Sequence, residues 1–380
     1  MKIAYVPSTF LPSIGGSETQ IHNMANKTIE LGNSVDIYLL KKEKIINRKY
    51  EIIKLNSIYI SLIFLLKYYL NIDFTFLLKI YFKKICKKKK YDVWHFQSAN
   101  YKTLLYIKPL KMLGEKVFIT FHGADIQKDE SINYGYRFDK RYELFLSDTL
   151  KYVDKAFVIS KDVERELKTF SFPSEKISRI PCSIELEKIE NIKVNKINDK
   201  KLKIITATRF QAKKKGLDFI EKIAVHLIEK KYKFKWTLVG KNSDELLNSS
   251  FIRDNLEYFN ILDEIKNFDE TYFPHSDLFK LYKNHDVYIN LARIESFGVT
   301  MIEAIACGLP VISFDTKGAN ELILNNKNGY LIMNYNAQEM ADFLIKEYEL
   351  IFKDKTIDST TVEKFDLKLV CQQFLNNYRN

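Results

Sequence analysis

The chain has few cysteines, and their spacing excludes two kinds of stabilising site. Cys86, Cys182, Cys307 and Cys371 stand far apart, with no C-x-x-C pair and no nearby histidine. We therefore expect neither a disulfide framework nor a metal cluster built on cysteine. The pattern is typical of a protein of the reducing cytoplasm.

Long apolar runs, repeats and low-complexity segments are missing as well. Uncharged runs in the most apolar region reach only twelve residues, from Leu55 to Leu66, short of the ~18 that span a bilayer. Lys2 is followed at once by the strand-like IAYV, so no signal peptide is expected. The 380 residues, 46% of them hydrophobic, fit two domains of ordinary size with full cores.

The net charge of +12 is concentrated in one segment. Between Ser61 and Tyr91 there are eight lysines and one aspartate, Asp73, interleaved with the apolar runs LIFLL and FTFLLKIYF. One interpretation is an amphipathic, basic helical pair that rests on an anionic membrane. The other is a core-packing helix, capped at Asp73, whose lysine-rich end complements the helix dipole. The sequence favours neither.

The stretch from Asn290 to Phe314 predicts a strand, a loop, a helix, a Gly-Leu-Pro turn and a second strand. Ser296 is the expected helix cap, and Gly308 and Pro310 set the end. The helix then begins at the carboxyl end of a strand, where ligands of open α/β sheets bind. Free N–H groups there suit a phosphate, namely those of Phe297, Gly298 and Val299.

Two carboxylates, Glu295 and Glu303, flank this predicted anion site. Glu303 stands among apolar residues, and no positive charge lies three or four residues away. A carboxylate on an apolar helix needs a partner, and pairs of hydroxyls on a ribose or sugar would serve. The alternative is that each glutamate is simply a good helix former on a wet face.

The segment ESFGVTMIEAIACGLPVI resembles the donor-binding signature of retaining GT-B glycosyltransferases of family 4, the "group 1" class. The resemblance implies an α/β protein with two Rossmann-like domains that face a central cleft. The donor lies on the second domain and the acceptor mainly on the first. In the family the second glutamate holds the donor ribose and the first contacts the transferred sugar, so these roles pass to Glu303 and Glu295.

Two motifs of the first half extend the resemblance. Gly15 and Gly16 precede a helix, with Ser17 and Gln20 in a capping-box pattern. They resemble the family's Gly-Gly-x-Glu loop, which implies that Gly16 faces the donor phosphates and adds Glu18 as a weaker candidate. KVFITF runs into His122, which matches the family histidine that touches the transferred sugar. His95 has no family role, and we interpret it as structural.

The second domain opens with the strand LKIITAT, followed by Arg209 and a lysine run. These resemble the family's Gly-Arg-x(4 to 5)-Lys-Gly motif, which holds the donor β-phosphate, although Thr208 replaces the glycine. We assign the lysine role to Lys215 rather than to Lys213 or Lys214, because it directly precedes Gly216. Ile261, in YFNIL, lies where the family places backbone beside the nucleotide base.

The predicted boundaries follow from these motifs. Residues 1–185 form the acceptor domain, joined by a C-terminal helix at about 362–380, and residues 186–361 form the donor domain. The polar segment Ile184–Lys201 is the expected linker. Residues after Asn336 are expected to form two helices, the last of which crosses back to the first domain. Cys182-Ser183 replaces the family's Asn-Gly.

No two aspartates stand two residues apart, so the D-x-D motif of metal-dependent glycosyltransferases is absent. We expect no metal. Arg209, Lys215 and the helix N-terminus would neutralise the leaving diphosphate. No carboxylate stands beside His122 in the sequence as an inverting general base or a clear nucleophile, and Asp125 is the nearest candidate. We therefore expect front-face transfer, which retains the anomeric configuration of the donor.

The predicted function is a metal-independent retaining glycosyltransferase that uses a UDP- or GDP-linked sugar, with no other cofactor. Its acceptor is a glycan or lipid-linked glycan of bacterial surface polysaccharide assembly. The protein is expected in the cytoplasm, or on the inner face of the cell membrane as a peripheral protein that contacts anionic lipid through residues 61–90. The alternatives are a catalytically silent GT-B partner subunit, a nucleic-acid-binding protein, and, less favoured, a sugar phosphorylase or epimerase. No nucleic-acid partner is expected, because basic charge alone does not explain a carboxylate pair.

Overall fold

The computed structural model describes residues 1–12, 15–41, 45, 48–195, 200–210, 212–263, 276–352 and 357–379. The chain divides into two compact units. The first comprises Met1–Cys182 together with Leu367–Asn380, and the second comprises Ser183–Asp366. Both divisions fall within a few residues of the boundaries at 185 and 362 that the motifs suggest.

The first unit is built on a parallel sheet whose strand order is β3-β2-β1-β4-β5-β6-β7. Its strands are β1 (Lys2–Pro7), β2 (Ser34–Leu39), β3 (Glu51–Lys54), β4 (Val93–Gln97), β5 (Val117–Phe121), β6 (Lys155–Val158) and β7 (Ile177–Arg179). The chain moves outward from β1 to β3 and then returns to the other side of β1. The order therefore reverses between β1 and β4, where open α/β sheets bind ligands.

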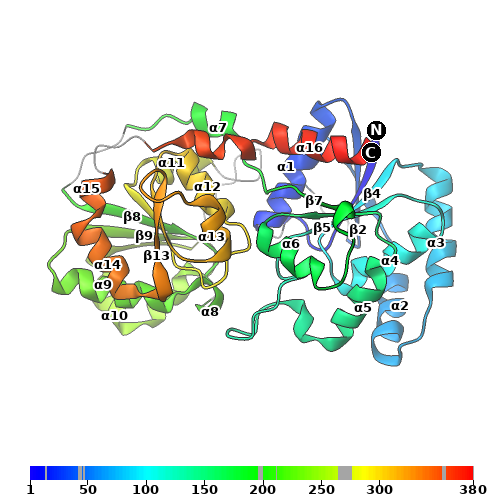
Figure 1. The fold of residues 1–380 in the computed structure, drawn as a ribbon, viewed down its shortest axis with the longest axis horizontal. Helices are drawn as coiled ribbons and strands as arrows, with labels where there is room; N and C mark the ends of the chain where they lie inside the picture. The colour runs from blue at the N-terminus through cyan, green and yellow to red at the C-terminus, as the bar shows by residue number, and fades with distance from the viewer. Residues whose placement is uncertain are drawn as a thin grey trace. The chain divides into compact units, whose positions relative to one another are not determined.

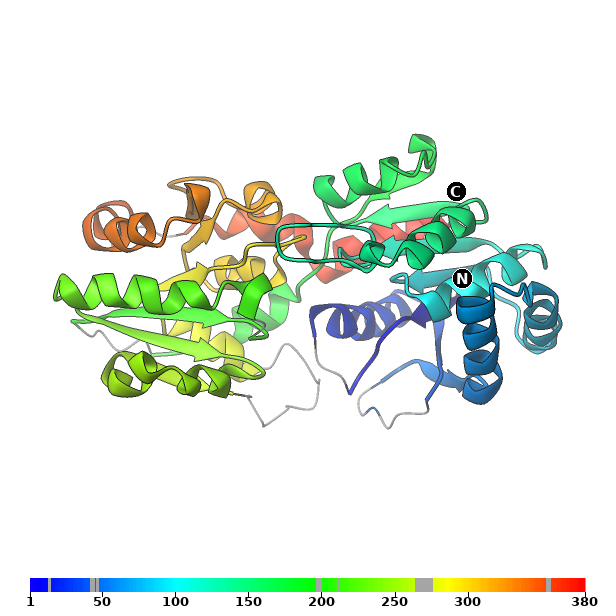
Figure 2. The ribbon, with the colours of Figure 1, turned by 90° about the horizontal axis from the view of Figure 1, so that it is seen from below.

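Helices cover both faces of this sheet (Figures 1 and 2). They are α1 (Gly16–Glu30), α2 (Ser57–Leu70), α3 (Thr75–Lys88), α4 (Tyr101–Lys111), α5 (Lys140–Leu150), α6 (Lys161–Lys168) and α16 (Leu367–Arg379). Helix α1 packs on α16, whereas α4 packs against α2, α3 and α5. Large side chains such as Trp94, Phe121 and Phe157 are fully buried in the core.

The C-terminal helix α16 is part of the first unit because its aromatic side chains enter that core. The Tyr378 hydroxyl lies 2.5 Å from Nδ1 of His95, and the Thr120 hydroxyl lies 2.7 Å from Nε2 of the same ring. Phe374 meets Phe157 edge-on, with ring centroids 4.9 Å apart. His95 is thus fully buried with both ring nitrogens bonded, which is the structural role predicted for it.

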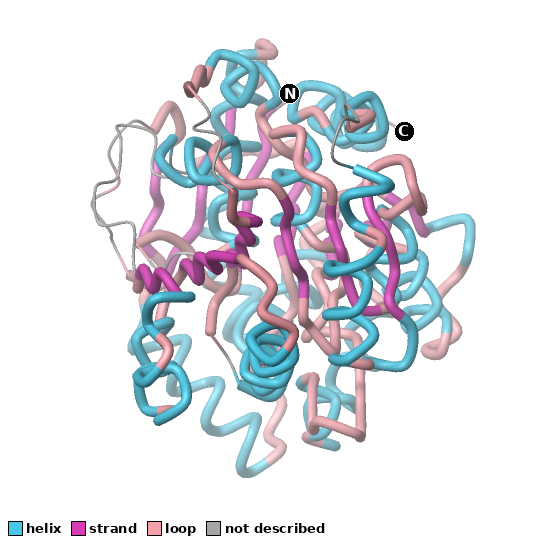
Figure 3. Tube along the Cα trace, turned by 90° about the vertical axis from the view of Figure 1, so that its left-hand side faces the viewer, coloured by secondary structure: helices cyan, strands magenta, loops and turns pink. Residues whose placement is uncertain are grey.

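The second unit repeats the architecture with the strand order β10-β9-β8-β11-β12-β13, again all parallel. Its strands are β8 (Leu202–Ala207), β9 (Phe234–Val239), β10 (Phe259–Leu262), β11 (Val287–Asn290), β12 (Val311–Phe314) and β13 (Gly329–Ile332). Strands lie side by side between helices (Figure 3). The order reverses between β8 and β11. The two parallel-sheet units confirm the predicted Rossmann-like fold class.

The helices of the second unit also lie on both faces of its sheet. They are α7 (Leu186–Asn191), α8 (Ala212–Lys215), α9 (Asp218–Glu229), α10 (Ser250–Asp254), α11 (Ser276–Lys283), α12 (Val299–Ala306), α13 (Lys317–Leu322), α14 (Ala337–Lys346) and α15 (Tyr348–Phe352). Helix α9 packs on α14, and α12 contacts both α11 and α13. Residues after Asn336 thus form more helices than the two predicted.

The segment expected to be a polar linker is partly a helix of the second unit. Ile189 of α7 is fully buried, and the Lys283 ammonium donates to the carbonyl oxygens of Ile189 and Ile192 at 2.6 Å each. Sequence composition missed this helix because it buries a single apolar side chain. Residues 196–199 of the predicted linker lie outside the described residues.

The basic segment of the first unit forms the hairpin of helices α2 and α3. Of its helical residues only Ile60, Ile63, Leu78 and Phe82 are buried. The core-packing interpretation is therefore right for the inner face alone. Across the described part of the chain, no helix combines the length and the apolar character needed to span a bilayer.

Candidate active site

Glycines bring two loops together at the carboxyl edge of the second sheet. Gly216 has φ +64°, and a Cβ there would collide with the carbonyl oxygen of Leu291 after β11. Gly240, at φ +139° after β9, would collide in the same way with the backbone of Thr208. Only glycine fits both positions. The loops after β8 and β11 are therefore packed backbone to backbone at the reversal of strand order.

Arg293 fastens the same two loops. Its backbone N–H donates to the carbonyl of Lys214 at 2.9 Å, and its guanidinium forms two 2.7 Å bonds with the carboxylate of Asp218. The guanidinium also stacks 4.4 Å from the ring of Phe219. A bidentate pair of this kind sets orientation as well as distance. Sequence reasoning did not single out Arg293.

The loops place Lys215 and Glu295 in direct contact. The ammonium and the carboxylate are 2.7 Å apart, and their side chains are only 19% and 14% exposed. Burial alone would raise the pKa of Glu295, but Lys215 and Lys214, with the Phe297 backbone N–H, hold that pKa below its usual value. Glu295 is thus an ionised carboxylate at neutral pH. Both residues were predicted, but their pairing was not.

The other cations of the lysine run differ in their surroundings. Lys213 is exposed, whereas Lys214 is half-buried. Burial lowers the pKa of Lys214; Glu295 opposes this shift and Arg209 adds to it. Arg209, the exposed residue that follows β8 by two positions, is therefore close enough to act on Lys214. The positive groups expected to hold a diphosphate are gathered at one strand edge.

The start of helix α12 differs from the prediction. Its cap is Gly298, at φ +102°, and the helix begins at Val299, so Ser296 is not the cap. Residues with a side chain rarely adopt this φ, which explains the glycine. The Phe297 N–H is not free, because it hydrogen bonds with Glu295. Gly298 and Val299 stand where a helix leaves its first N–H groups without intrahelical acceptors.

Glu303 lies inside α12 with 3% of its surface exposed. Burial raises the pKa of this carboxyl to about 8, and a hydrogen bond from the Tyr282 hydroxyl, at 3.4 Å, only partly offsets the shift. The interpretation of Glu303 as a helix former on a wet face is wrong. A buried acid with one long hydrogen bond still has acceptor capacity for two ligand hydroxyls.

In the first unit, His122 follows β5 as predicted. Its Nε2 atom is buried and has no hydrogen-bond partner among the described residues. Burial lowers the pKa of the imidazole, although Asp125 and Glu18 oppose the shift. The ring is therefore neutral at neutral pH. A buried ring nitrogen without a partner is suited to one hydroxyl of a ligand.

Asp125 organises the loop beside His122. Its carboxylate accepts hydrogen bonds from the backbone N–H groups of Ala99, His122 and Gly123 at 3.2, 3.0 and 2.9 Å. With its oxygens so engaged and only 2% of the residue exposed, Asp125 is not placed to act as a base or nucleophile. Its contact with His122 is through the backbone.

Helix α1 begins at Gly16, with Gly15 in the cap position and no side-chain cap. The predicted capping box is therefore wrong, because Ser17 already lies inside the helix. Ser17 instead donates to the Glu18 carboxylate at 2.9 Å, and Thr9 donates to the same group at 2.6 Å. Glu18 is buried at the reversal of the first sheet, so this weaker candidate lies close to His122.

Serine hydroxyls from the two reversing strands also meet in the first unit. Ser8, after β1, and Ser98, after β4, lie 2.8 Å apart through their Oγ atoms. Ser98 has φ +111°, a conformation that non-glycine residues rarely adopt. Such strain often marks a functional loop. Nothing in the sequence pattern distinguished these serines.

The predicted site residues thus fall into two groups. Arg209, Lys215, Glu295, Phe297, Gly298, Val299 and Glu303 belong to the second unit, and Gly16 and His122 belong to the first. Ile261 lies in β10, where it pairs with Leu238 of β9 two strands from the reversal. Residues 264–275, which follow β10, lie outside the described residues. No group of three or more metal-binding side chains occurs among the described residues.

Two family models match the chain. The model for glycosyl transferases group 1 matches residues 187–350, and the model for glycosyltransferase family 4 matches residues 14–188. Each match falls largely on one of the two structural units. Together with the fold, the matches support assignment of the chain to the group 1 glycosyltransferases of the GT-B fold.

Solved structures share this fold over the whole chain. A glycosyltransferase from Rickettsia africae aligns with a TM-score of 0.73 at 21% identity, covering 100% of this chain and 97% of that one. HepE of Anabaena, solved with UDP, aligns with a TM-score of 0.73 at 15% identity, covering 100% of both chains.

Among curated sequences, the amylovoran biosynthesis glycosyltransferase AmsK of Erwinia amylovora is 29% identical over 248 residues. The match covers 63% of this chain and 57% of that protein. The chain spans about half the length of the curated relatives that it matches first.

Proposed function

We propose that the protein is a retaining glycosyltransferase that moves a sugar from a nucleotide sugar to a glycan or glycolipid. The observation that carries the proposal is the buried Lys215–Glu295 ion pair at the strand reversal of the second unit, followed along the chain by helix α12 with the raised-pKa carboxyl of Glu303. This reversal lies in the half of the chain matched by the group 1 model. Lys215 is suited to bind a diphosphate, Glu303 a ribose and Glu295 a sugar.

The donor in this proposal is a UDP- or GDP-linked sugar. UDP is the first choice, because the structurally similar HepE was solved with UDP. Arg209, Lys215 and the α12 N-terminus at Gly298 would hold the diphosphate. Glu303 would accept from the ribose hydroxyls, and Glu295 would contact the transferred sugar. The resemblance adds Ile261 beside the base and Gly16 near the phosphates.

The proposed chemistry is front-face transfer with retention. The bond from the anomeric carbon to the diphosphate breaks, and the acceptor oxygen bonds to that carbon on the same face. The departing phosphate oxygen takes the acceptor proton. A double-displacement route needs a free carboxylate, but Glu295 is engaged by Lys215 and Asp125 by three backbone N–H groups. His122, neutral with Nε2 open, would orient a sugar hydroxyl.

We further propose that transfer needs no metal ion. The sequence has no D-x-D motif, and positive side chains already stand where the leaving diphosphate would be neutralised. Turnover in excess EDTA should equal turnover without it. Abolished turnover that Mg²⁺ or Mn²⁺ restores would overturn this part of the proposal.

The proposed acceptor is carried on a membrane lipid during assembly of a bacterial surface polysaccharide. The relative AmsK is a glycosyltransferase of amylovoran biosynthesis. The support is the outer face of the α2–α3 hairpin. It exposes a stripe of apolar side chains, Ile58, Leu62, Leu65 and Tyr69 on α2 and Phe76 and Ile80 on α3. Exposed lysines continue the face of α3, namely Lys83, Lys84, Lys87, Lys88 and Lys90.

Lys89 does not belong to this face. Its ammonium pairs with Asp36 at 3.1 Å and with Glu51 at 2.6 Å. An apolar stripe bordered by lysines is the pattern of a helix that lies in an anionic interface. The protein would then work as a peripheral protein on the inner face of the cell membrane.

Two measurements test the reaction. A thermal-shift screen over UDP-, GDP-, ADP- and CMP-sugars should identify one donor class. NMR of the product linkage should then show the donor's anomeric configuration, and an inverted centre would refute front-face transfer.

A nucleic-acid-binding protein would instead bind RNA or DNA at moderate salt. A silent partner subunit would bind the donor without turnover, although such a subunit is not expected to keep Lys215, Glu295 and Glu303 together.

A further inference from the structure

A pocket of about 270 Å³ lies in the first unit, between the α2–α3 hairpin and helices α4 and α5. It is lined by these helices and the turns beside them, not by the loops that follow the strands. Its wall is part apolar and part polar, and the apolar part includes Ile63, Leu78, Leu104 and Phe145. The pocket is therefore separate from both strand reversals.

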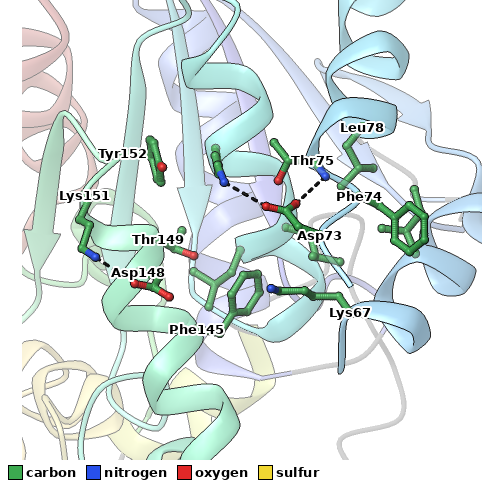
Figure 4. Close-up of a pocket in the computed structure, with 14 residues that line it drawn as sticks. Lys67, Asp73, Phe74, Thr75, Leu78, Phe145, Asp148, Thr149, Lys151 and Tyr152 are labelled. Carbon is green, nitrogen blue, oxygen red and sulfur yellow. Dashed lines mark hydrogen bonds and ion pairs between the residues drawn. The ribbon is translucent and has the colours of Figure 1, made fainter. Parts of the chain in front are cut away.

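Three lysines line the pocket, and two of them are neutralised. Lys108 pairs with Asp73 at 3.1 Å, and Lys151 pairs with Asp148 at 2.9 Å. Lys67 donates to the side-chain oxygen of Asn71 at 3.0 Å and forms no ion pair with any described residue. Figure 4 shows the Lys67 side chain extending toward Phe145. The lining thus holds one uncompensated positive charge beside an apolar wall.

The pocket walls are fixed by polar contacts between helices. Asp73, besides pairing with Lys108 of α4, accepts from the backbone N–H of Thr75 at 2.8 Å, which fixes the start of α3 (Figure 4). The Tyr68 hydroxyl donates to Asp139 at 2.6 Å, and the Arg141 guanidinium lies 3.9 Å from the Tyr68 ring. Both ends of the hairpin turn are therefore tied to the rest of the unit, and the pocket is pre-formed.

Size and lining limit the occupant. Pockets for drug-sized ligands occupy ~300 to 1,000 Å³, so this one is too small for a nucleotide sugar and suits part of an amphiphile. A free inorganic anion would leave the apolar wall unused. Leu70 and Ile72, in the hairpin turn beside Lys67 and Asp73, are 62% and 44% exposed. The apolar lining thus continues onto exposed apolar surface at the turn.

We propose that this pocket binds one anionic phospholipid. The lipid phosphate pairs with Lys67, and the adjoining carbons lie against Ile63, Leu78 and Phe145. Such a site selects a lipid by its headgroup, which a diffuse basic surface does not do. It goes beyond sugar transfer and does not rest on it, because no residue of the pocket belongs to the proposed donor or acceptor site.

The test is calorimetric titration with dihexanoyl phosphatidylglycerol below its micelle concentration. We expect saturable binding of one lipid per chain, weaker binding of dihexanoyl phosphatidylcholine, and none of inorganic phosphate. Lys67→Gln should weaken binding of the phosphatidylglycerol about five-fold. Leu105→Trp, which fills the pocket, should abolish it. Lys116→Gln, at an exposed lysine just before β5 and outside both the pocket and the hairpin face, is the matched control and should leave the affinity unchanged.

Three outcomes would overturn the proposal: equal affinity for the two lipids, inorganic phosphate binding as tightly as the phospholipid, or Lys116→Gln weakening binding as much as Lys67→Gln. A thermal melt checks that Leu105→Trp folds. If it does not, the comparison of the two lysine variants decides alone. The proposed transfer reaction is judged separately by nucleotide titration, so failure of the lipid site leaves that reaction standing.

Discussion

The two units share one topology, but the groups at their strand reversals differ in charge. In the second unit the reversal holds the ionised pair of Lys215 and Glu295, and helix α12, which follows it in the chain, holds the buried carboxyl of Glu303. In the first it holds the hydroxyls of Ser8 and Ser98 and the buried carboxyl group of Glu18, which accepts from Thr9 and Ser17. The neutral imidazole of His122 follows the next strand. The fold therefore supplies the same edge twice, and the two edges differ in that a buried lysine stands at the second and hydroxyls and a neutral imidazole stand at the first. We propose that the second edge holds the charged donor and the first the neutral sugar.

The largest expected effect comes from removing the cation of the second edge. Lys215→Ala should lower kcat/KM by ~10² to 10³, because a donor aimed at developing charge is lost. It also leaves the buried Glu295 carboxylate without its ion-pair partner. Lys213→Ala is the matched control, since Lys213 is the exposed neighbour in the same run. Equal losses in the two variants would show that only overall charge matters.

Glu303 should give the next largest effect. At pH 9, where the carboxyl is ionised, Glu303→Ala should weaken donor binding at least about ten-fold to a hundred-fold, since a hydrogen bond to a charged group contributes ~1.5 to 3 kcal/mol. Glu303→Gln, which keeps one acceptor oxygen, should cost less. Unchanged affinity in the Ala variant, measured by calorimetry, would remove Glu303 from the site.

The pH dependence of donor binding follows from the same residue. Burial raises the pKa of Glu303 to about 8, so at lower pH the donor-free protein carries a proton that the ribose contact must displace. Affinity should rise with pH up to about 8 and level off above it. Titrations at pH 6, 7, 8 and 9 test this, and Glu303→Gln should flatten the curve. A wild-type affinity that falls over this range would contradict the assignment.

A smaller effect is expected at the neutral edge. His122→Ala should lower turnover about ten-fold, the value of one hydrogen bond to a neutral group, while nucleotide affinity stays unchanged. His226→Ala is a suitable control, because His226 lies in the second unit and contacts Asp342. Loss of nucleotide affinity in His122→Ala would break the distinction between the two edges.

The smallest single effects should come from the hairpin face. Replacing Lys83, Lys84, Lys87, Lys88 or Lys90 by Gln should each weaken binding to phosphatidylglycerol vesicles by about five-fold at low salt. Lys89→Gln should differ, costing stability rather than vesicle affinity, because Lys89 pairs with Asp36 and Glu51. Sedimentation with vesicles measures the bound fraction of each variant. If the variant with all five lysines replaced binds vesicles as well as the wild type does, the membrane contact is refuted.

The sequence predicted the fold because strand-forming runs alternate with helical segments and reach their turns at glycines. It also predicted that Glu303 is not a solvent-facing residue, since apolar neighbours on one helix leave a carboxylate no local cation. The sequence did not predict contacts between loops that are distant in the chain. The Lys215–Glu295 pair spans 80 positions, and the Arg293 clamp depends on a similar approach. Local capping rules also failed at Ser296 and Ser17, because the cap positions are held by Gly298 and Gly15 instead.

The hairpin shows the same limit. The same amphipathic periodicity fits a helix on a membrane surface and a helix packed on a core. Only the exposed fractions of the side chains show which residues face outward. The strain at Ser98 has no sequence signal at all, because it is set by strands that are far apart in the chain.

One titration tests the central claim most directly. The nucleoside diphosphate with the largest thermal shift is titrated in excess EDTA into the wild-type protein, Lys215→Ala and His122→Ala. We predict that the wild type and His122→Ala bind with the same affinity and that Lys215→Ala binds far more weakly. If EDTA abolishes binding, or if His122→Ala loses as much affinity as Lys215→Ala, the assignment of a metal-free donor site to the second unit is wrong.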